Sequence, residues 1–142
     1  MRAFLDANVL FSAALNSQGR AGTLIRITAA SQGALLTSPY VREEARRNIA
    51  TKAPSALARL VRIFGELELA EDAGYDLRAW AEGEGLPAKD APVLAAAVLA
   101  RADILVTGDR RHFGALYGRT LRGVRVISPS DAITLVAGLA EG

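Results

Sequence analysis

The chain has 142 residues, 51% of them hydrophobic, and a mean hydropathy of +0.20, which predicts one globular domain over residues 1–142 and excludes a disordered protein. No apolar run is long enough to span a membrane, and Asp6 interrupts the first apolar stretch too early for a secretory signal, so we expect a cytoplasmic protein without membrane contact. Cysteine is absent, which excludes disulfides and thiolate metal sites.

Arginine dominates the basic residues. The net charge is only +2, yet the pI is about 9.4, and all but Lys52 and Lys89 of the 17 basic residues are arginine. Because a guanidinium group binds phosphate in a bidentate manner and stacks on bases, the composition is compatible with a polyanionic partner. A GC-rich genome, which favours Arg and Ala codons, explains the same composition without one.

Apolar patterning and cap residues predict strands that alternate with helices. Ser38 and Pro39 form a typical helix start, with Ser38 as the cap and Pro39 at the first helical position. Strands are predicted over 2–6, 34–37, 66–70, 103–109 and 124–128. Helices are predicted over 21–33, 38–50, 54–64, 75–85, 90–102 and 129–142. This alternation predicts an α/β fold with a mostly parallel sheet and helices on both faces.

Two predicted strands end on an aspartate, Asp6 and Asp109. Ligands of such sheets bind beyond the carboxyl ends of the strands, near the point where the strand order reverses. If the two strands are neighbours, the two carboxylates lie close together and need a cation or a proton between them. The alternative for each is ordinary, because aspartate often leaves a strand and caps the following segment.

Asp90 opens the alanine-rich helix that leads into the second of these strands. As an N-cap it would complement the helix dipole. The same position also brings its carboxylate to the edge of the sheet where Asp6 and Asp109 are expected. Both interpretations of Asp90 stay open.

Helical phase separates the adjacent residues Glu43 and Glu44. Val41, Ala45 and Ile49 recur with helical spacing and define the face expected to pack on the sheet. Glu44 lies beside that face, where a carboxylate needs a partner. Glu43 points away from it, and we expect it in solvent, paired with Arg47 one helical turn on.

Four acids from distant segments, Asp6, Glu44, Asp90 and Asp109, are therefore expected at one edge of the sheet. Carboxylates and water are the ligands that hard cations such as Mg²⁺ and Mn²⁺ prefer. A metal bound there would polarise a phosphoryl oxygen and lower the pKa of an attacking water.

The residues of three blocks resemble a known family. "FLDANVLFSA" near the N-terminus, "SPYVREEARRNI" in the middle and "KDAPVLAAAVLARADILVTGDRRHF" near the C-terminus are similar, in order and spacing, to PIN-domain ribonucleases. The similarity extends over nearly the whole chain and is strongest to the VapC-like toxins of toxin–antitoxin pairs. It implies a three-layer α/β/α sandwich.

The resemblance also assigns roles to single residues. Asp6, Glu44, Asp90 and Asp109 match the family's metal ligands and catalytic acids. Asn8 and Thr107 match polar positions that support the first and last acids by hydrogen bonds. Asp103 matches a frequent family aspartate, but it opens the strand that Asp109 closes and is expected to be structural.

The implied activity is Mg²⁺- or Mn²⁺-dependent cleavage of single-stranded RNA, with an antitoxin protein as partner and self-association as a homodimer. Arg110, Arg111 and His112 would lie beside the site, where arginine could hold a phosphate and histidine could stack on a base. An exposed basic loop with a solvated or capping histidine is the alternative for these three.

Other phosphate and hydrolase chemistries lack their residues. A haloacid-dehalogenase-type phosphatase needs an acid at the position of Asn8, and neither the receiver-domain pattern nor G-x-G-x-x-G is present. The single histidine does not support a Ser-His-Asp triad. The remaining rival is a PIN-like module that binds RNA or protein without cleaving.

Overall fold

The computed structural model describes residues 1–141, which fold around one six-stranded sheet. The strands are β1 (Arg2–Leu5), β2 (Ala34–Thr37), β3 (Glu68–Leu69), β4 (Ile104–Val106), β5 (Thr120–Leu121) and β6 (Val124–Ile127). Their order in the sheet is β3-β2-β1-β4-β6-β5, and β5 is antiparallel to β6 while the other neighbours pair in parallel. The predicted mostly parallel sheet is confirmed.

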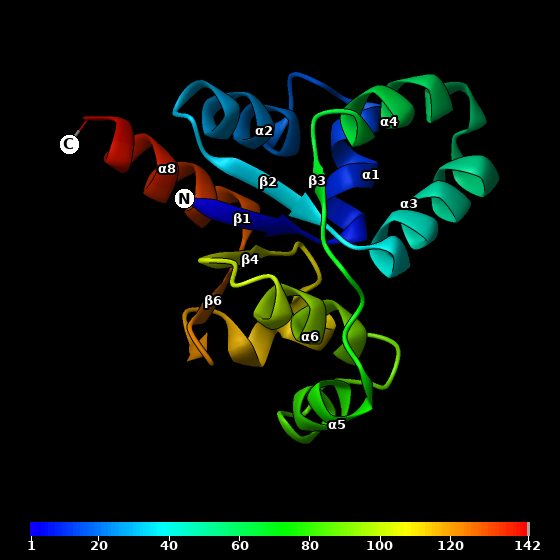
Figure 1. The fold of residues 1–142 in the computed structure, drawn as a ribbon. Helices are drawn as coiled ribbons and strands as arrows, with labels where there is room; N and C mark the ends of the chain where they lie inside the picture. The colour runs from blue at the N-terminus through cyan, green and yellow to red at the C-terminus, as the bar shows by residue number, and fades with distance from the viewer. Residues whose placement is uncertain (142) are drawn as a thin grey trace.

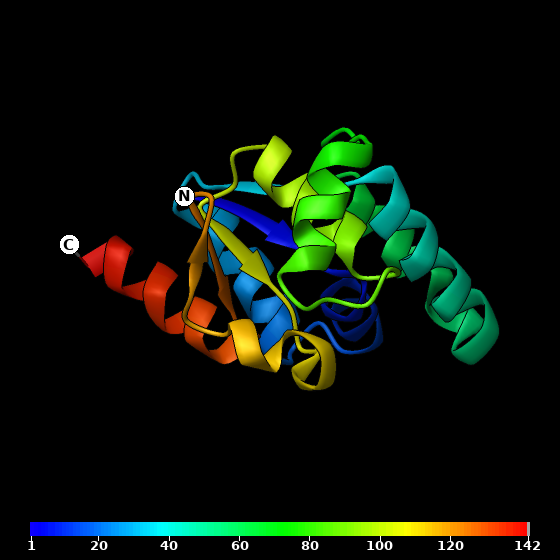
Figure 2. The ribbon, with the colours of Figure 1, turned by 90° about the horizontal axis from the view of Figure 1, so that it is seen from below.

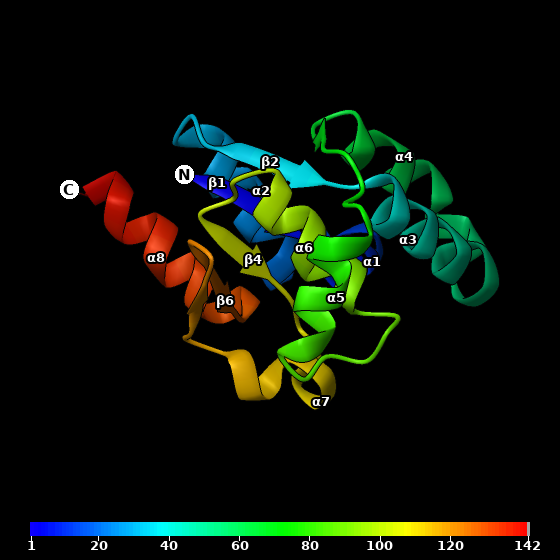
Figure 3. The ribbon, with the colours of Figure 1, turned by 60° about the horizontal axis from the view of Figure 1, so that its bottom comes forward.

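Helices cover both faces of this sheet (Figures 1 and 2). They are α1 (Ala7–Leu15), α2 (Arg20–Ala30), α3 (Pro39–Lys52), η1 (Pro54–Ala56), α4 (Leu57–Phe64), α5 (Tyr75–Gly83), α6 (Ala91–Leu99), α7 (Arg110–Phe113), η2 (Gly114–Leu116) and α8 (Pro129–Glu141). α1, α2 and α8 lie on one face, and α5 and α6 pack together on the other (Figure 3). The result is the expected α/β/α sandwich. Within residues 1–141, no helix combines the length and the apolar character that a membrane span requires.

The strand order reverses between β1 and β4, which are the two central strands. From β1 the chain moves outward to β2 and β3, and it later returns to β4 on the other side of β1. Both strands are fully buried except for Arg2 at the start of β1. Residues that follow β1 and β4 therefore share the carboxyl edge at the topological switch point, where ligands of such sheets bind.

Several local expectations need correction. The prediction passed over α1, which follows β1 directly and is apolar on most of its surface, so it shows no amphipathic period. It also missed β5, and it expected 66–70 to be half-buried, whereas β3 has two exposed residues. Position 142 of the predicted last helix lies outside the described residues.

Helix α3 begins as predicted but packs differently. Ser38 accepts a hydrogen bond from the backbone N–H of Val41, as expected of an N-cap. Val41, Ala45 and Ile49 are fully buried, so the predicted inward face is confirmed. α3 packs chiefly against α1, α4 and α6 rather than on the sheet, so the expected packing of this face on the sheet was wrong.

Candidate functional site

Asp6 is the most enclosed of the four predicted acids. It follows β1, caps α1 through a 2.7 Å hydrogen bond from Ala7 N–H to Oδ1, and is only 4% exposed. Its Oδ2 accepts hydrogen bonds from Thr107 Oγ1 (2.8 Å) and Asn8 Nδ2 (3.1 Å). Burial raises the pKa of Asp6 to about 6, against these hydrogen bonds, which favour the ionised form. The metal-free carboxylate is therefore poorly stabilised.

Asn8 and Thr107 connect the ends of the two central strands. Asn8 Oδ1 accepts from Gly108 N–H at 2.7 Å, and its Nδ2 lies 3.2 Å from Thr107 Oγ1. Thr107 Oγ1 in turn accepts from Asp109 N–H at 3.2 Å. Because the bonds of Asn8 run from the first turn of α1 to the segment after β4, they help to fix the orientation of Asp6 and Asp109 relative to each other.

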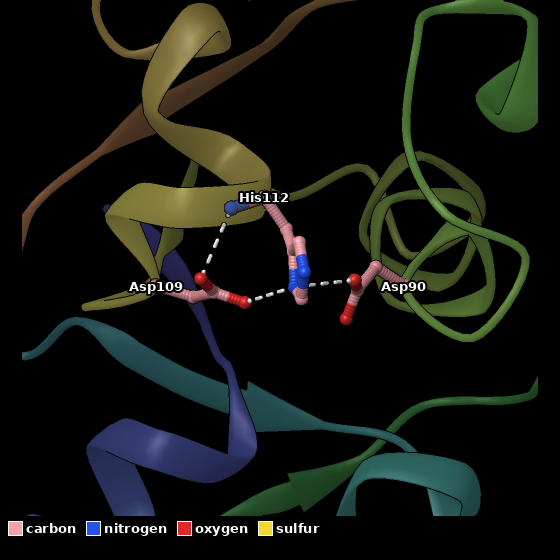
Figure 4. A group of neighbouring side chains, drawn as sticks. All are labelled: Asp90, Asp109 and His112. Atoms are coloured by element: carbon pink, nitrogen blue, oxygen red, sulfur yellow. Dashed lines mark hydrogen bonds and ion pairs between the residues drawn. The ribbon is translucent and has the colours of Figure 1, made fainter.

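Asp109, His112 and Asp90 form a second group of contacts (Figure 4). Asp109 caps α7, where its Oδ1 accepts from His112 N–H at 3.1 Å. His112 Nδ1 lies 2.9 Å from Asp109 Oδ2 and 3.1 Å from Asp90 Oδ2. Asp109 thus caps a helix, which was the ordinary alternative for a strand-end aspartate, and it also lines the cleft with Asp6, Glu44 and Asp90.

Asp90 occupies the N-cap position of α6 but makes no capping hydrogen bond with its side chain. It is 8% exposed, and its Oδ2 receives no hydrogen bond within the described residues, although His112 Nδ1 is near. Burial raises the pKa of Asp90, and nearby Asp109 raises it further, against His112 and Lys89. A buried carboxylate oxygen without a donor needs a proton or a cation.

The two adjacent glutamates of α3 have different surroundings. Glu44 is partly buried and lines the same cleft as Asp6. Its pKa is raised mainly by burial and, to a smaller extent, by the negative charge of Asp90. Glu43 is exposed and forms an ion pair with Arg46 (2.6 Å), which lowers its pKa. The expected partner, Arg47, was wrong by one position, since i+3 and i+4 residues both neighbour Glu43 on a helix.

Asp103 lies at the opposite, amino end of β4. Its Oδ2 accepts a 2.7 Å hydrogen bond from the backbone N–H of Arg2. This contact joins the starts of the two central strands, far along the strands from Asp6 and Asp109. Asp103 therefore has the structural surroundings that the sequence indicated.

A cleft of about 600 Å³ opens at the carboxyl edge of β1 and β4. All four predicted acids line it, and so does Asn8. Its basic residues are Arg20, Lys89 and Arg110. Arg20 and Lys89 were not expected in this cleft. Lys89 directly precedes Asp90, which was a signal for it, whereas no local pattern indicated Arg20, which begins α2. Arg111 is exposed and does not line this cleft.

The donor set fits a hard divalent cation. Carboxylates from four separate segments face one cleft, burial raises the pKa of three of them, Asp6, Glu44 and Asp90, and Asp90 Oδ2 lacks a hydrogen-bond donor within the part of the chain described. Oxygen ligands with room for water are what Mg²⁺ and Mn²⁺ require. Asp90, Asp109 and His112 also offer ligand atoms within 4.8 Å of one another.

The chain is an α/β protein with a mostly parallel sheet and an acidic cleft at the topological switch point. Comparison with protein families identifies the family to which it belongs. A family model described as PIN domain matches residues 2–111. The chain belongs to the PIN domain family. Comparison with curated proteins found no significant match.

Solved structures show the same fold at low sequence identity. PAE2754 from Pyrobaculum aerophilum matches with a TM-score of 0.69 and 20% identity, over 97% of this chain and 90% of that one. VapBC2 from Rickettsia felis, bound to a DNA fragment from its promoter, matches with a TM-score of 0.68 and 17% identity over 90% and 98% of the chains. VapC20 from Mycobacterium tuberculosis, a toxin that cleaves the sarcin–ricin loop, matches with a TM-score of 0.56 and 17% identity. The match covers 80% of this chain and 94% of that one.

Proposed function

We propose that this protein is a metal-dependent endoribonuclease that cleaves single-stranded RNA. The observation that carries the proposal is the meeting of four acids from four separate segments, Asp6, Glu44, Asp90 and Asp109, around one cleft. An arrangement of this kind is electrostatically costly without a cation. Membership of the PIN domain family, whose members are generally nucleases that use divalent metals, supports it.

Each group of residues has a role in this proposal. Asp6, Glu44, Asp90 and Asp109 would hold the metal, and Asn8 and Thr107 would orient Asp6 by their hydrogen bonds to its carboxylate. A bound Mg²⁺ or Mn²⁺ supplies a Lewis acid that polarises a phosphoryl oxygen and makes water a better nucleophile.

The basic residues of the cleft would bind the RNA backbone. Arg20, Lys89 and Arg110 line it together with the acids, so phosphates that flank the scissile bond would meet positive charge on its walls. Arg111 is exposed and outside the cleft, so it would bind a more distant phosphate.

We further propose that the chain, as one domain, is the toxin of a toxin–antitoxin pair and forms a homodimer. The VapBC complexes among the structural neighbours support an antitoxin partner. An antitoxin segment near the cleft would interfere with metal or RNA binding, as its inhibitory role requires.

The test is an RNA-cleavage assay with total bacterial RNA in Mg²⁺, in Mn²⁺ and in EDTA. Wild type and Asp109→Asn are compared with Asp103→Asn, whose amide oxygen can still accept the hydrogen bond from Arg2 N–H. We expect metal-dependent cleavage in wild type and Asp103→Asn and none in Asp109→Asn or in EDTA. Binding of RNA without cleavage in any metal would instead indicate the non-catalytic module.

A further inference from the structure

His112 is the only histidine of the chain, and its ring lies between two acids of the cleft (Figure 4). Nδ1 is 2.9 Å from Asp109 Oδ2 and 3.1 Å from Asp90 Oδ2. The ring is mostly enclosed, with 24% of the side chain exposed. Its Nδ1 is directed at the carboxylates of Asp90 and Asp109.

The spacing of these atoms fits shared coordination. Adjacent ligands of an octahedral ion bound at about 2.1 Å are separated by about 3.0 Å, close to both Nδ1–oxygen distances. Asp90 Oδ2 is buried and receives no hydrogen bond within residues 1–141, so its lone pairs are free to bind a cation. One nitrogen and two oxygens therefore converge on a small space.

We infer that His112 is a direct metal ligand through Nδ1, and that the site consequently selects a first-row transition ion such as Mn²⁺ over Mg²⁺. This rests on the metal centre of the proposed function and adds a nitrogen donor to its carboxylates. Imidazole is a good ligand for transition metals, whereas Mg²⁺ prefers oxygen and keeps its water. With Nδ1 as the ligand atom, the proton of the neutral ring is on Nε2.

A positioning role is the competing explanation for the same contacts. In that case His112 holds Asp90 and Asp109 by ion pairing, and it does not touch the metal. The two explanations differ in one observable, because only a ligand transfers unpaired electron spin from Mn²⁺ to its nitrogen.

Pulsed electron paramagnetic resonance of Mn²⁺-loaded protein measures that observable. Since the chain has one histidine, an imidazole nitrogen coupling can come only from His112. We expect the ¹⁴N coupling in wild type, its replacement by a ¹⁵N coupling after selective histidine labelling, and its loss in His112→Ala. Bound Mn²⁺ without a nitrogen coupling overturns this inference and leaves the four-acid centre intact.

Affinity provides the second measurement. We expect His112→Ala to weaken Mn²⁺ binding by on the order of tenfold while Mg²⁺ affinity changes much less. Arg78→Ala, an exposed residue of α5, serves as the control. Equal losses for both ions would indicate a positioning role and contradict ligation. Binding of Mn²⁺ and Mg²⁺ is also compared between wild type and Asp109→Asn. If Asp109→Asn changes the affinity for neither ion, the metal centre of the proposed function is wrong as well.

Discussion

Asp6 combines a structural and a proposed chemical role in one side chain. Its Oδ1 caps α1, and its Oδ2 accepts from Thr107 and Asn8. Hydrogen bonds from Ala7 N–H, Asn8 and Thr107 thus orient the carboxylate before any metal binds. Pre-orientation of this kind lowers the entropic cost of assembling a metal site.

The neighbouring glutamates of α3 give a matched pair of variants. We expect Glu44→Gln to reduce RNA cleavage by about a hundredfold or more, since losing a ligand from the metal site removes a few kcal/mol of transition-state stabilisation. Glu43→Gln breaks only an exposed pair with Arg46 and should leave cleavage near wild type. Initial rates at saturating Mn²⁺ measure both. Equal losses, or a larger loss for Glu43→Gln, would show that the assignment on α3 is wrong.

At the scale of elements, the loop that enters α2 depends on close backbone contact. A Cβ on Gly22 would lie 2.2 Å from the carbonyl oxygen of Ser17, a distance that only movement of the loop could relieve. Arg20, which lines the cleft, lies between these two residues. The absence of a Cβ at position 22 thus permits the close backbone approach that precedes Arg20 in this loop.

Two glycine substitutions test this arrangement. We expect Gly22→Ala to lower the free energy of unfolding by about 1–3 kcal/mol through overpacking. Gly138→Ala in α8, where a Cβ meets nothing within 4 Å, should raise it by about 0.5–1 kcal/mol because alanine is the better helix former. Urea denaturation measures both changes. A Gly22→Ala protein as stable as wild type would contradict the close contact.

The sequence predicted most of these elements and the meeting of the acids, because both depend on rules that act locally or through strand order. Asp6 and Asp109 end strands, and helical phase alone separates Glu44 from Glu43. The helix α1 was missed because its residues are apolar on most sides and show no helical period, although the side chain of Asp6 caps it. The contact of His112 with Asp109 at i+3 could have been predicted, whereas its contact with Asp90 depends on tertiary packing.

At the scale of the whole molecule, the acids of the cleft make the stability of the metal-free protein depend on pH. The pKa of Asp6 is about 6 in the folded state, against 3.8 as its ordinary value, so the folded state binds more protons between these values. Above pH 6 the buried carboxylate of Asp6 is charged, which destabilises the folded state. The free energy of unfolding should therefore rise as the pH falls from 7 toward 4. Glu44 and Asp90, whose pKa values are also raised, act in the same direction.

We expect the free energy of unfolding in EDTA to rise by up to about 3 kcal/mol between pH 7 and pH 4 from Asp6 alone. Denaturant titrations at several pH values measure it, and Asp6→Asn should flatten the curve while cleavage is lost and the fold remains. Mn²⁺ should stabilise wild type at pH 7, as a ligand of the folded state does. Identical pH profiles for wild type and Asp6→Asn would contradict the high pKa of Asp6.

The two outermost strands, β3 and β5, are each only two residues long. A rim this short offers a foreign backbone very few hydrogen-bonding groups, and Glu68 adds a charge to one side of it. Intermolecular extension of the sheet, the usual route to fibrils and to strand-exchanged assemblies, is therefore disfavoured. We therefore expect complexes of this protein to be built mainly from the surfaces of its helices and loops, and substitutions on those surfaces can locate its partners.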